Sequence, residues 1–202
     1  MRLAQLLAAL SLVASQANAQ PASTPSPLIG TWESIDRAQG GIGGILVLAA
    51  DNSVLSMVSV LSDDRYTRRG NRVQITSSQG DRLGMRVVIT GNTLVQTSEG
   101  KSVNMTRIPG SGADTGIVGK WRFPYVSPEG QTLQGTVEYT GDGVARLRLP
   151  LQTKIGTYSV SASELTLRFQ GAPPETSTFS IDGDVLILQR PDGAKARMAR
   201  TR

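Results

Sequence analysis

The chain has 202 residues with 21 basic and 16 acidic side chains, which gives a formal net charge of +5. Histidine and cysteine are absent, and this excludes disulfides, Ser–His and Cys–His nucleophiles and the common zinc sites. Aromatic residues make up only 4% of the chain, too few for a nucleic-acid stacking surface. We therefore expect a protein that is not an enzyme, with no catalytic residue, metal, cofactor or nucleic-acid partner.

The first 19 residues have the features of a signal peptide. Arg2 precedes an apolar run over residues 3–13, and residues 17–19 (ANA) supply small side chains for cleavage. The run is shorter than the roughly 20 apolar residues that a spanning helix needs. We expect cleavage near Ala19–Gln20, no membrane span, and a periplasmic or secreted mature protein.

The composition divides the rest of the chain into two similar units. Residues 20–27 are rich in Pro, Ser and Thr and are predicted to form a disordered arm, while residues 109–116 (PGSGADTG) read as a linker. Residues 28–108 and 117–202 then repeat one pattern. LIGTW at 28–32 returns as IVGKW at 117–121, Tyr66 corresponds to Tyr158, and both units close on an arginine.

Each unit is predicted to be all-β. Short runs such as RVQIT at 72–76 and ELTLR at 164–168 alternate apolar with polar residues and are bounded by Gly, Asn and Asp, which is typical of antiparallel hairpins. About seven or eight short strands per unit are expected. Closure removes exposed strand edges, so the predicted fold is two tandem antiparallel meander β-barrels.

The opening Gly-x-Trp and the closing Arg resemble the lipocalin-like, or calycin, barrels, here duplicated in tandem in a bacterial exported protein. In such barrels the Trp of the first strand closes one end of the cavity, and an Arg from the last strand packs across its ring. The resemblance implies that Trp32 pairs with Arg107 and that Trp121 pairs with Arg200. A guanidinium over an indole is favourable by about 0.5–2 kcal/mol.

The aromatic residues suggest where a ligand would bind. The first unit contains only Trp32 and Tyr66, and the other seven lie in the second unit. Aromatic walls suit a small apolar ligand, although aromatic side chains also fill cores. The candidate ligand-binding residues, which could instead be structural, are Trp32, Arg107, Trp121, Tyr139, Tyr158, Phe179 and Arg200.

We therefore expect a non-enzymatic binding or carrier protein for a small apolar ligand in the cell envelope. The alternative partner is an envelope protein. Small exported barrels that open with Gly-x-Trp also occur among bacterial protease inhibitors, in which an N-terminal arm enters the protease cleft, and residues 20–27 would be that arm.

Several polar and flexible segments have structural interpretations as well as functional ones. Asp63-Asp64 is interpreted as a pair of turn residues and residues 40–44 (GGIGG) as a mobile hairpin loop. The basic residues gather in two groups, which could meet an acidic partner or form a solvated strand face. These groups are Arg65, Arg68, Arg69 and Arg72, and Lys195, Arg197, Arg200 and Arg202.

Overall fold

The computed structural model describes residues 26–111 and 116–201. The predicted signal peptide and residues 20–25 of the predicted arm lie outside the described residues, as do residues 112–115 of the linker. The prediction of a disordered arm therefore stays a prediction.

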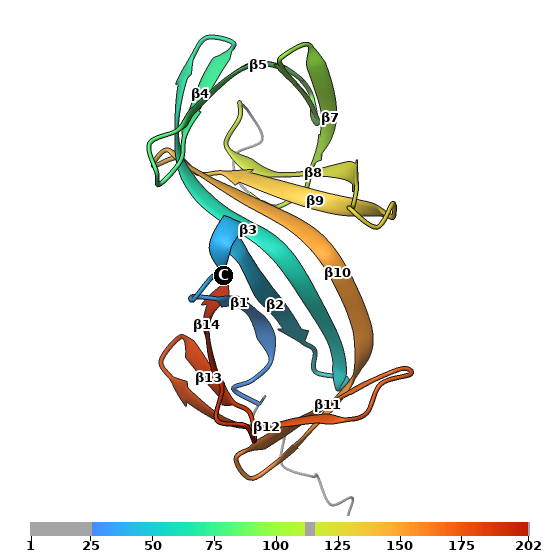
Figure 1. Ribbon diagram of the computed structural model, residues 1–202. Coiled ribbons are helices and arrows are strands. Elements are labelled where there is room, and N and C mark those ends of the chain that lie inside the picture. Colours follow the sequence, from blue (N-terminus) through green and yellow to red (C-terminus); the bar gives the residue numbers. More distant parts are fainter. Residues whose placement is uncertain (1–25, 112–115, 202) are drawn as a thin grey trace, which may run out of the picture.

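The described chain consists almost entirely of β-strands, seven in each unit (Figure 1). Those of the first unit are β1 (Gly30–Ser34), β2 (Ile42–Leu48), β3 (Ser53–Arg69), β4 (Arg72–Thr76), β5 (Arg82–Thr90), β6 (Thr93–Ser98) and β7 (Lys101–Arg107). Those of the second are β8 (Gly119–Val126), β9 (Thr132–Tyr139), β10 (Val144–Ser161), β11 (Glu164–Phe169), β12 (Glu175–Asp182), β13 (Val185–Gln189) and β14 (Lys195–Thr201). A 3-10 turn, η1 (Gln39–Gly41), precedes β2. The all-β prediction and the predicted number of strands are confirmed.

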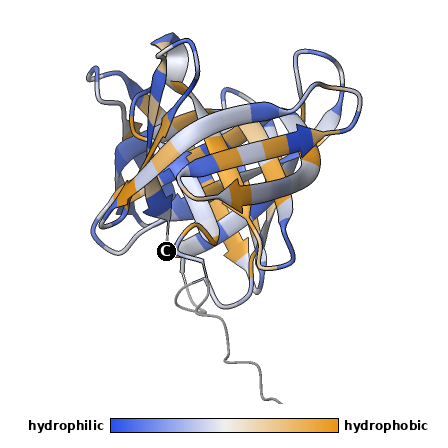
Figure 2. Cartoon of the chain, turned by 90° about the horizontal axis from the view of Figure 1, so that it is seen from below, coloured by the Kyte–Doolittle hydropathy of each residue, from blue (hydrophilic) through white to orange (hydrophobic). Residues whose placement is uncertain are grey.

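Alternation of polar and apolar side chains explains why these segments form strands. Successive side chains of a strand point to opposite faces of the sheet, and hydrophobic and hydrophilic residues alternate along many of the strands (Figure 2). In β4, Val73 is 1% exposed whereas its neighbours Arg72 and Gln74 are exposed. One face of the sheet therefore faces a core and the other faces solvent.

The fourteen strands form one antiparallel meander sheet that closes into a ring. Each strand pairs with the next, β7 pairs with β8 across the linker, and β14 pairs with β1. Two separate barrels would instead require each unit to close on itself, through β1 with β7 and β8 with β14. The prediction of one barrel per unit is therefore wrong.

A further pairing, between β3 and β10, joins the two sides of the ring across its middle, which we call the waist. The two longest strands, β3 and β10, run antiparallel from Ser53↔Thr157 to Arg65↔Val144. The register shifts between Pro150 and Gln152, as expected because proline lacks the N–H that a regular ladder uses and is found at bulges. Figure 1 shows these two strands passing side by side through the middle of the molecule, with a lobe of the sheet at either end.

Each lobe combines strands from both units. We call them the Trp32 lobe (β1, β2, the first half of β3, the second half of β10, and β11–β14) and the Trp121 lobe (the second half of β3, β4–β9 and the first half of β10). The two units have thus exchanged halves across the waist.

The hydrophobic cores follow the lobes and not the units. In the Trp32 lobe, Trp32 and Leu48 of the first unit are buried with Leu165 and Leu186 of the second. The core of the Trp121 lobe likewise mixes residues of both units, including Val73, Leu94, Trp121 and Tyr139. Neither unit contains a complete core by itself.

Two tyrosines at equivalent positions each form a hydrogen bond from one unit to the other. The Tyr66 hydroxyl donates to the Thr140 carbonyl at 2.8 Å, and the Tyr158 hydroxyl donates to the Ala49 carbonyl at 2.9 Å. In each case a tyrosine of one unit contacts the β-hairpin of the other unit. The symmetry of these contacts supports the internal duplication seen in the sequence.

We expect the stability of the Trp121 lobe to fall steeply in alkali. Burial raises the pKa of Tyr139 to about 12 from its ordinary value of 10.0, so the folded protein favours the neutral phenol. The unfolded chain ionises first as the pH rises, and roughly 2–3 kcal/mol of stability should be lost between about pH 10 and pH 12. Urea unfolding across that range measures the effect. Tyr139→Phe should flatten the pH dependence, and parallel curves for the two proteins would contradict the assignment.

Candidate functional site

A tryptophan and an arginine close one end of each lobe, but the partners differ from those expected. The Arg200 guanidinium lies 4.1 Å from the centre of the Trp32 ring, and the Arg107 guanidinium lies 4.1 Å from the centre of the Trp121 ring. The predicted pairs, Trp32 with Arg107 and Trp121 with Arg200, are therefore wrong. The physical reason is the ring closure, which places β14 beside β1 and β7 beside β8.

Hydrogen bonds hold both stacks in place. Nε1 of Trp32 donates to the Leu28 carbonyl at 2.8 Å, and Nε1 of Trp121 donates to the Ile117 carbonyl at 2.8 Å. Arg200 donates to the carbonyls of Ile29 and Pro27, and Arg107 makes the equivalent bonds to Val118 and Gly116. The LIGTW and IVGKW motifs thus encode the closed end of each lobe.

The glycine of each motif makes room for the arginine. Gly30 has φ +139°, and a Cβ added there would lie 2.6 Å from Nη1 of Arg200. Gly119 has φ +126°, and its Cβ would lie 2.7 Å from Nη1 of Arg107. Only glycine combines this backbone conformation with so close an approach.

The other predicted site residues lie in the two cores. Tyr139 is 1% exposed, its hydroxyl donates to Oε1 of Gln96 at 3.3 Å, and its ring meets Tyr66 edge to face at 5.1 Å. Tyr158 and Phe179 pack in the core of the Trp32 lobe. The exchange of strands separates aromatic residues that the sequence places together in the second unit.

A pocket of about 420 Å³ opens in the lumen of the Trp32 lobe. Apolar side chains from several strands form its wall, and serine and charged side chains complete the lining. None of the seven predicted ligand-binding residues lines this pocket. The wall comprises Leu46, Leu165, Leu167, Leu188 and Met198, and the polar lining includes Ser34, Ser56, Glu175, Ser177, Arg190 and Lys195.

The pocket exists because three serines replace bulky residues of the other lobe. Strand register makes Ser34 equivalent to Phe123, Ser56 to Leu147 and Ser177 to Met85. Phe123, Leu147 and Met85 all belong to the core of the Trp121 lobe. At these three positions the Trp121 lobe therefore carries a bulky side chain where the Trp32 lobe carries a serine.

Two equivalent glycines show the difference in packing directly. A Cβ added at Gly135 of the Trp121 lobe would lie 2.7 Å from Leu149 and 2.8 Å from the Phe123 ring. At Gly44 of the Trp32 lobe the nearest atoms would be Oγ of Ser34 at 3.4 Å and Cε of Met198 at 3.8 Å. Gly43 and Gly44 lie within β2, so the predicted mobile loop over residues 40–44 is wrong for them.

The serine hydroxyls of the pocket are not equivalent. Ser34 Oγ accepts the backbone N–H of Gly44 at 2.8 Å, so it helps to hold β1 against β2. In the described part of the chain, the hydroxyls of Ser56 and Ser177 form no hydrogen bond with the protein. These two hydroxyls are available to a polar group of a ligand.

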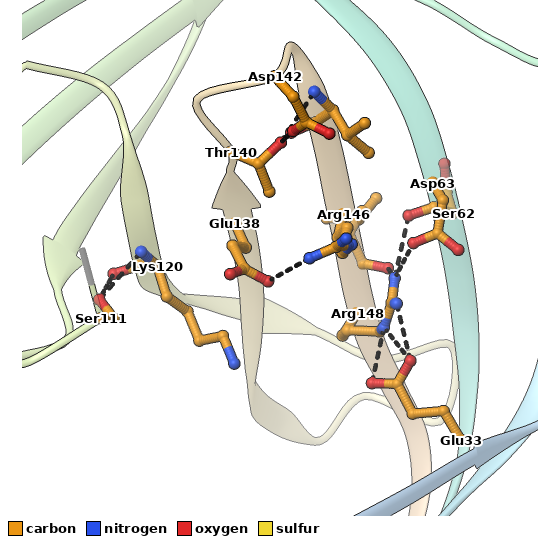
Figure 3. Close-up of polar contacts among 12 residues, drawn as sticks. Glu33, Ser62, Asp63, Ser111, Lys120, Glu138, Thr140, Asp142, Arg146 and Arg148 are labelled. Carbon is orange, nitrogen blue, oxygen red and sulfur yellow. Dashed lines mark hydrogen bonds and ion pairs between the residues drawn. The ribbon is translucent and has the colours of Figure 1, made fainter. Parts of the chain in front are cut away.

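A separate ion-pair network lies at the waist, outside the pocket (Figure 3). Nη2 of Arg148 lies 2.7 Å from a carboxylate oxygen of Glu33, and its Nε donates to both oxygens of that group at 2.8 and 2.9 Å. Nη1 of Arg148 also lies 2.9 Å from Asp63, and Asp63 pairs with Arg37 at 2.6 Å. The network joins β1, β3 and β10.

Asp63 is a strand residue within this network, so its interpretation as a turn residue is wrong. Burial raises the pKa of its carboxyl, but hydrogen bonds and charges from Arg37 and Arg148 outweigh burial and hold the pKa below the ordinary 3.8. Its stabilising contribution is therefore present above pH 3.8 and is lost as the pH falls through the lowered pKa. The arrangement is that of a structural clamp.

Within residues 26–111 and 116–201, no three His, Cys, Asp or Glu residues lie close enough together to hold a metal ion. In the same ranges no helix is long and apolar enough to cross a membrane.

The architecture places the chain among proteins built from a single all-antiparallel β-sheet, here closed into a ring. No protein-family model matches it. Searches of curated proteins and of solved structures likewise give no match.

Proposed function

We propose that the chain is a non-enzymatic binding protein that holds one small amphipathic molecule in the lumen of the Trp32 lobe. The observation that carries the proposal is the replacement of Phe123, Leu147 and Met85 by serine at the equivalent positions of one lobe. An unfilled core costs stability, so a pocket lined by serines where the other lobe carries bulky core residues is best explained by an occupant. The volume of about 420 Å³ lies in the usual range for ligand pockets.

The lining suggests the chemistry of the ligand. Leucine and methionine side chains favour an apolar body, which gains free energy by leaving water. Arg190 and Lys195 are exposed residues of the lining and outnumber its one acidic residue, Glu175, so they favour an acidic head group. Ser56 and Ser177 can bond to polar atoms of the ligand. A medium-chain carboxylic acid combines these features. Export of the protein and a role as an envelope carrier are part of the same proposal.

Refilling the pocket tests this function. Ser56→Leu and Ser177→Met copy the residues of the Trp121 lobe without touching the Ser34–Gly44 hydrogen bond. We expect the double variant to bind decanoate at least tenfold more weakly than the unchanged protein in isothermal titration calorimetry, because the added side chains occupy the space of the acyl chain.

A matched control separates pocket filling from a general effect of added bulk. Ser180 lies on the same strand as Ser177 but is exposed, so Ser180→Met should leave decanoate binding unchanged. The double variant should also unfold at a higher temperature than the unchanged protein, since it fills a void. Equal decanoate affinity in all three proteins, or no binding by the unchanged protein, would overturn the proposal.

A further inference from the structure

Three arginines form a row across the outer face of the Trp121 lobe. Arg69 on β3 lies directly opposite Arg72 on β4, and Arg72 lies directly opposite Arg86 on β5. Neighbouring strands are about 4.8 Å apart, so the row spans about 10 Å. All three side chains are exposed. We call them the arginine row.

The row has no internal counter-charge. Among the described residues, no Asp or Glu forms an ion pair with any of the three arginines, and none of them forms a side-chain hydrogen bond. Like charges directly opposite one another destabilise a sheet. Two such oppositions in succession therefore cost stability that the fold does not recover through its own contacts.

The arginine row borders a hollow of about 560 Å³. Gly84 lies in it, and a Cβ at that position would meet no atom within 4 Å. The hydroxyls of Thr67 and Thr97, on neighbouring strands, line the same hollow. Ser98 also lines it, but its hydroxyl donates to the Gly84 carbonyl at 3.2 Å. Glu99 at its edge is the one acidic residue of the lining, so the hollow keeps an excess of positive charge.

We propose that the arginine row is a binding site for a ligand that carries two or more linked phosphate groups. A guanidinium group offers a planar pair of donors that matches phosphate oxygens. One carboxylate cannot reach three arginines spread over about 10 Å, whereas linked phosphates can bridge neighbouring guanidinium groups and neutralise them together. The hydroxyls of Thr67 and Thr97 can donate hydrogen bonds to the remaining phosphate oxygens, and the hollow has room for them. The arginine row lies on the Trp121 lobe and the lumen pocket lies in the Trp32 lobe, so the two sites are independent.

Titration with tripolyphosphate tests the proposal at about 0.15 M ionic strength, where weak surface attraction is largely screened. We expect the unchanged protein to bind tripolyphosphate, and Arg72→Gln to bind it at least tenfold more weakly. The variant removes the central arginine from an exposed position, so it should remain folded. Without ligand its melting temperature should rise, because both repulsive oppositions disappear.

Arg122→Gln is the matched control, since it removes the same charge from an exposed strand position outside the hollow. It should bind tripolyphosphate as the unchanged protein does. Citrate provides a second control, as a trianion built from carboxylates. Equal losses in the two variants, or equal affinity for citrate and tripolyphosphate, would overturn the proposal.

Sedimentation with vesicles distinguishes the source of the phosphates. Phosphatidylcholine vesicles with and without phosphatidic acid are compared for the unchanged protein and Arg72→Gln. Binding that needs both phosphatidic acid and Arg72 supports clustered lipid head groups as the ligand. Tripolyphosphate binding without vesicle binding supports a free oligophosphate.

Discussion

Replacing Arg148 by methionine is expected to lower the free energy of unfolding by about 2–3 kcal/mol. The side chains of Arg148 and Glu33 are only 14% and 16% exposed, so the variant leaves the Glu33 carboxylate largely out of water and without its partner. Asp63 loses one of its two arginines but keeps its pair with Arg37. Removing one partner of a fully buried pair costs about 3–5 kcal/mol, and the residual exposure here reduces that figure.

A double-mutant cycle measures the interaction itself. Urea unfolding of Glu33→Gln, Arg148→Met and the combined variant should show a coupling of about 1–3 kcal/mol, because the two residues share one contact. Arg146→Met is the control on the same strand. Its pair with Glu138 is longer, at 3.4 Å, and its side chain is 44% exposed, so a loss below about 1 kcal/mol is expected. Equal losses for Arg146 and Arg148 would contradict a clamp at the waist.

The second large effect is expected at the closed end of the Trp32 lobe. Gly30→Ala should cost about 3 kcal/mol of unfolding free energy. Part of the loss comes from forcing alanine into φ +139°. The larger part comes from displacing the Arg200 guanidinium, which sits 2.6 Å from the new methyl position, and so losing its stack on Trp32 and its bonds to carbonyls.

Two glycines provide controls for this variant. Gly91 has φ +56° but no atom within 4 Å of an added Cβ, so Gly91→Ala reports backbone strain alone and should cost about 1 kcal/mol. Gly119→Ala should match Gly30→Ala, because a Cβ there lies 2.7 Å from Nη1 of Arg107. Denaturant unfolding compares the three variants. A loss at Gly30 no greater than that at Gly91 would show that the arginine moves aside without cost.

The sequence predicted the strands, because short alternating runs are local patterns. The resemblance to lipocalin-like barrels implied that each tryptophan stacks on an arginine, which is so, but the arginine that it implied for each tryptophan was the wrong one. Alternation fixes which side chains face inward and says nothing of which distant strand closes the sheet. One signal was present: residues 53–69 contain neither glycine nor proline, so β3 continues beyond one lobe into the next.

The lumen pocket was missed for a different reason. The aromatic residues of the sequence lie in the cores, whereas small serine side chains line the pocket. Aligning the two units would pair Ser34 with Phe123 directly, since both lie two residues after the tryptophan. The equivalence of Ser177 with Met85 needs the strand register, which a sequence alone does not supply. The arginine row was predicted in part, through Arg69 and Arg72, but Arg86 comes from a distant strand.

The exchange of strands makes one lobe an insertion within the other. The Trp121 lobe is built from one continuous stretch between β3 and β10, whereas the Trp32 lobe needs both ends of the described chain, as in the bond from Arg200 to the Ile29 carbonyl. We therefore expect the Trp121 lobe to fold first and to hold the two remaining segments at the waist. Until β14 docks between β13 and β1, both of these strands keep an unpaired edge that can pair with other chains. β14, the last of the described strands, thus protects β1, the first of them.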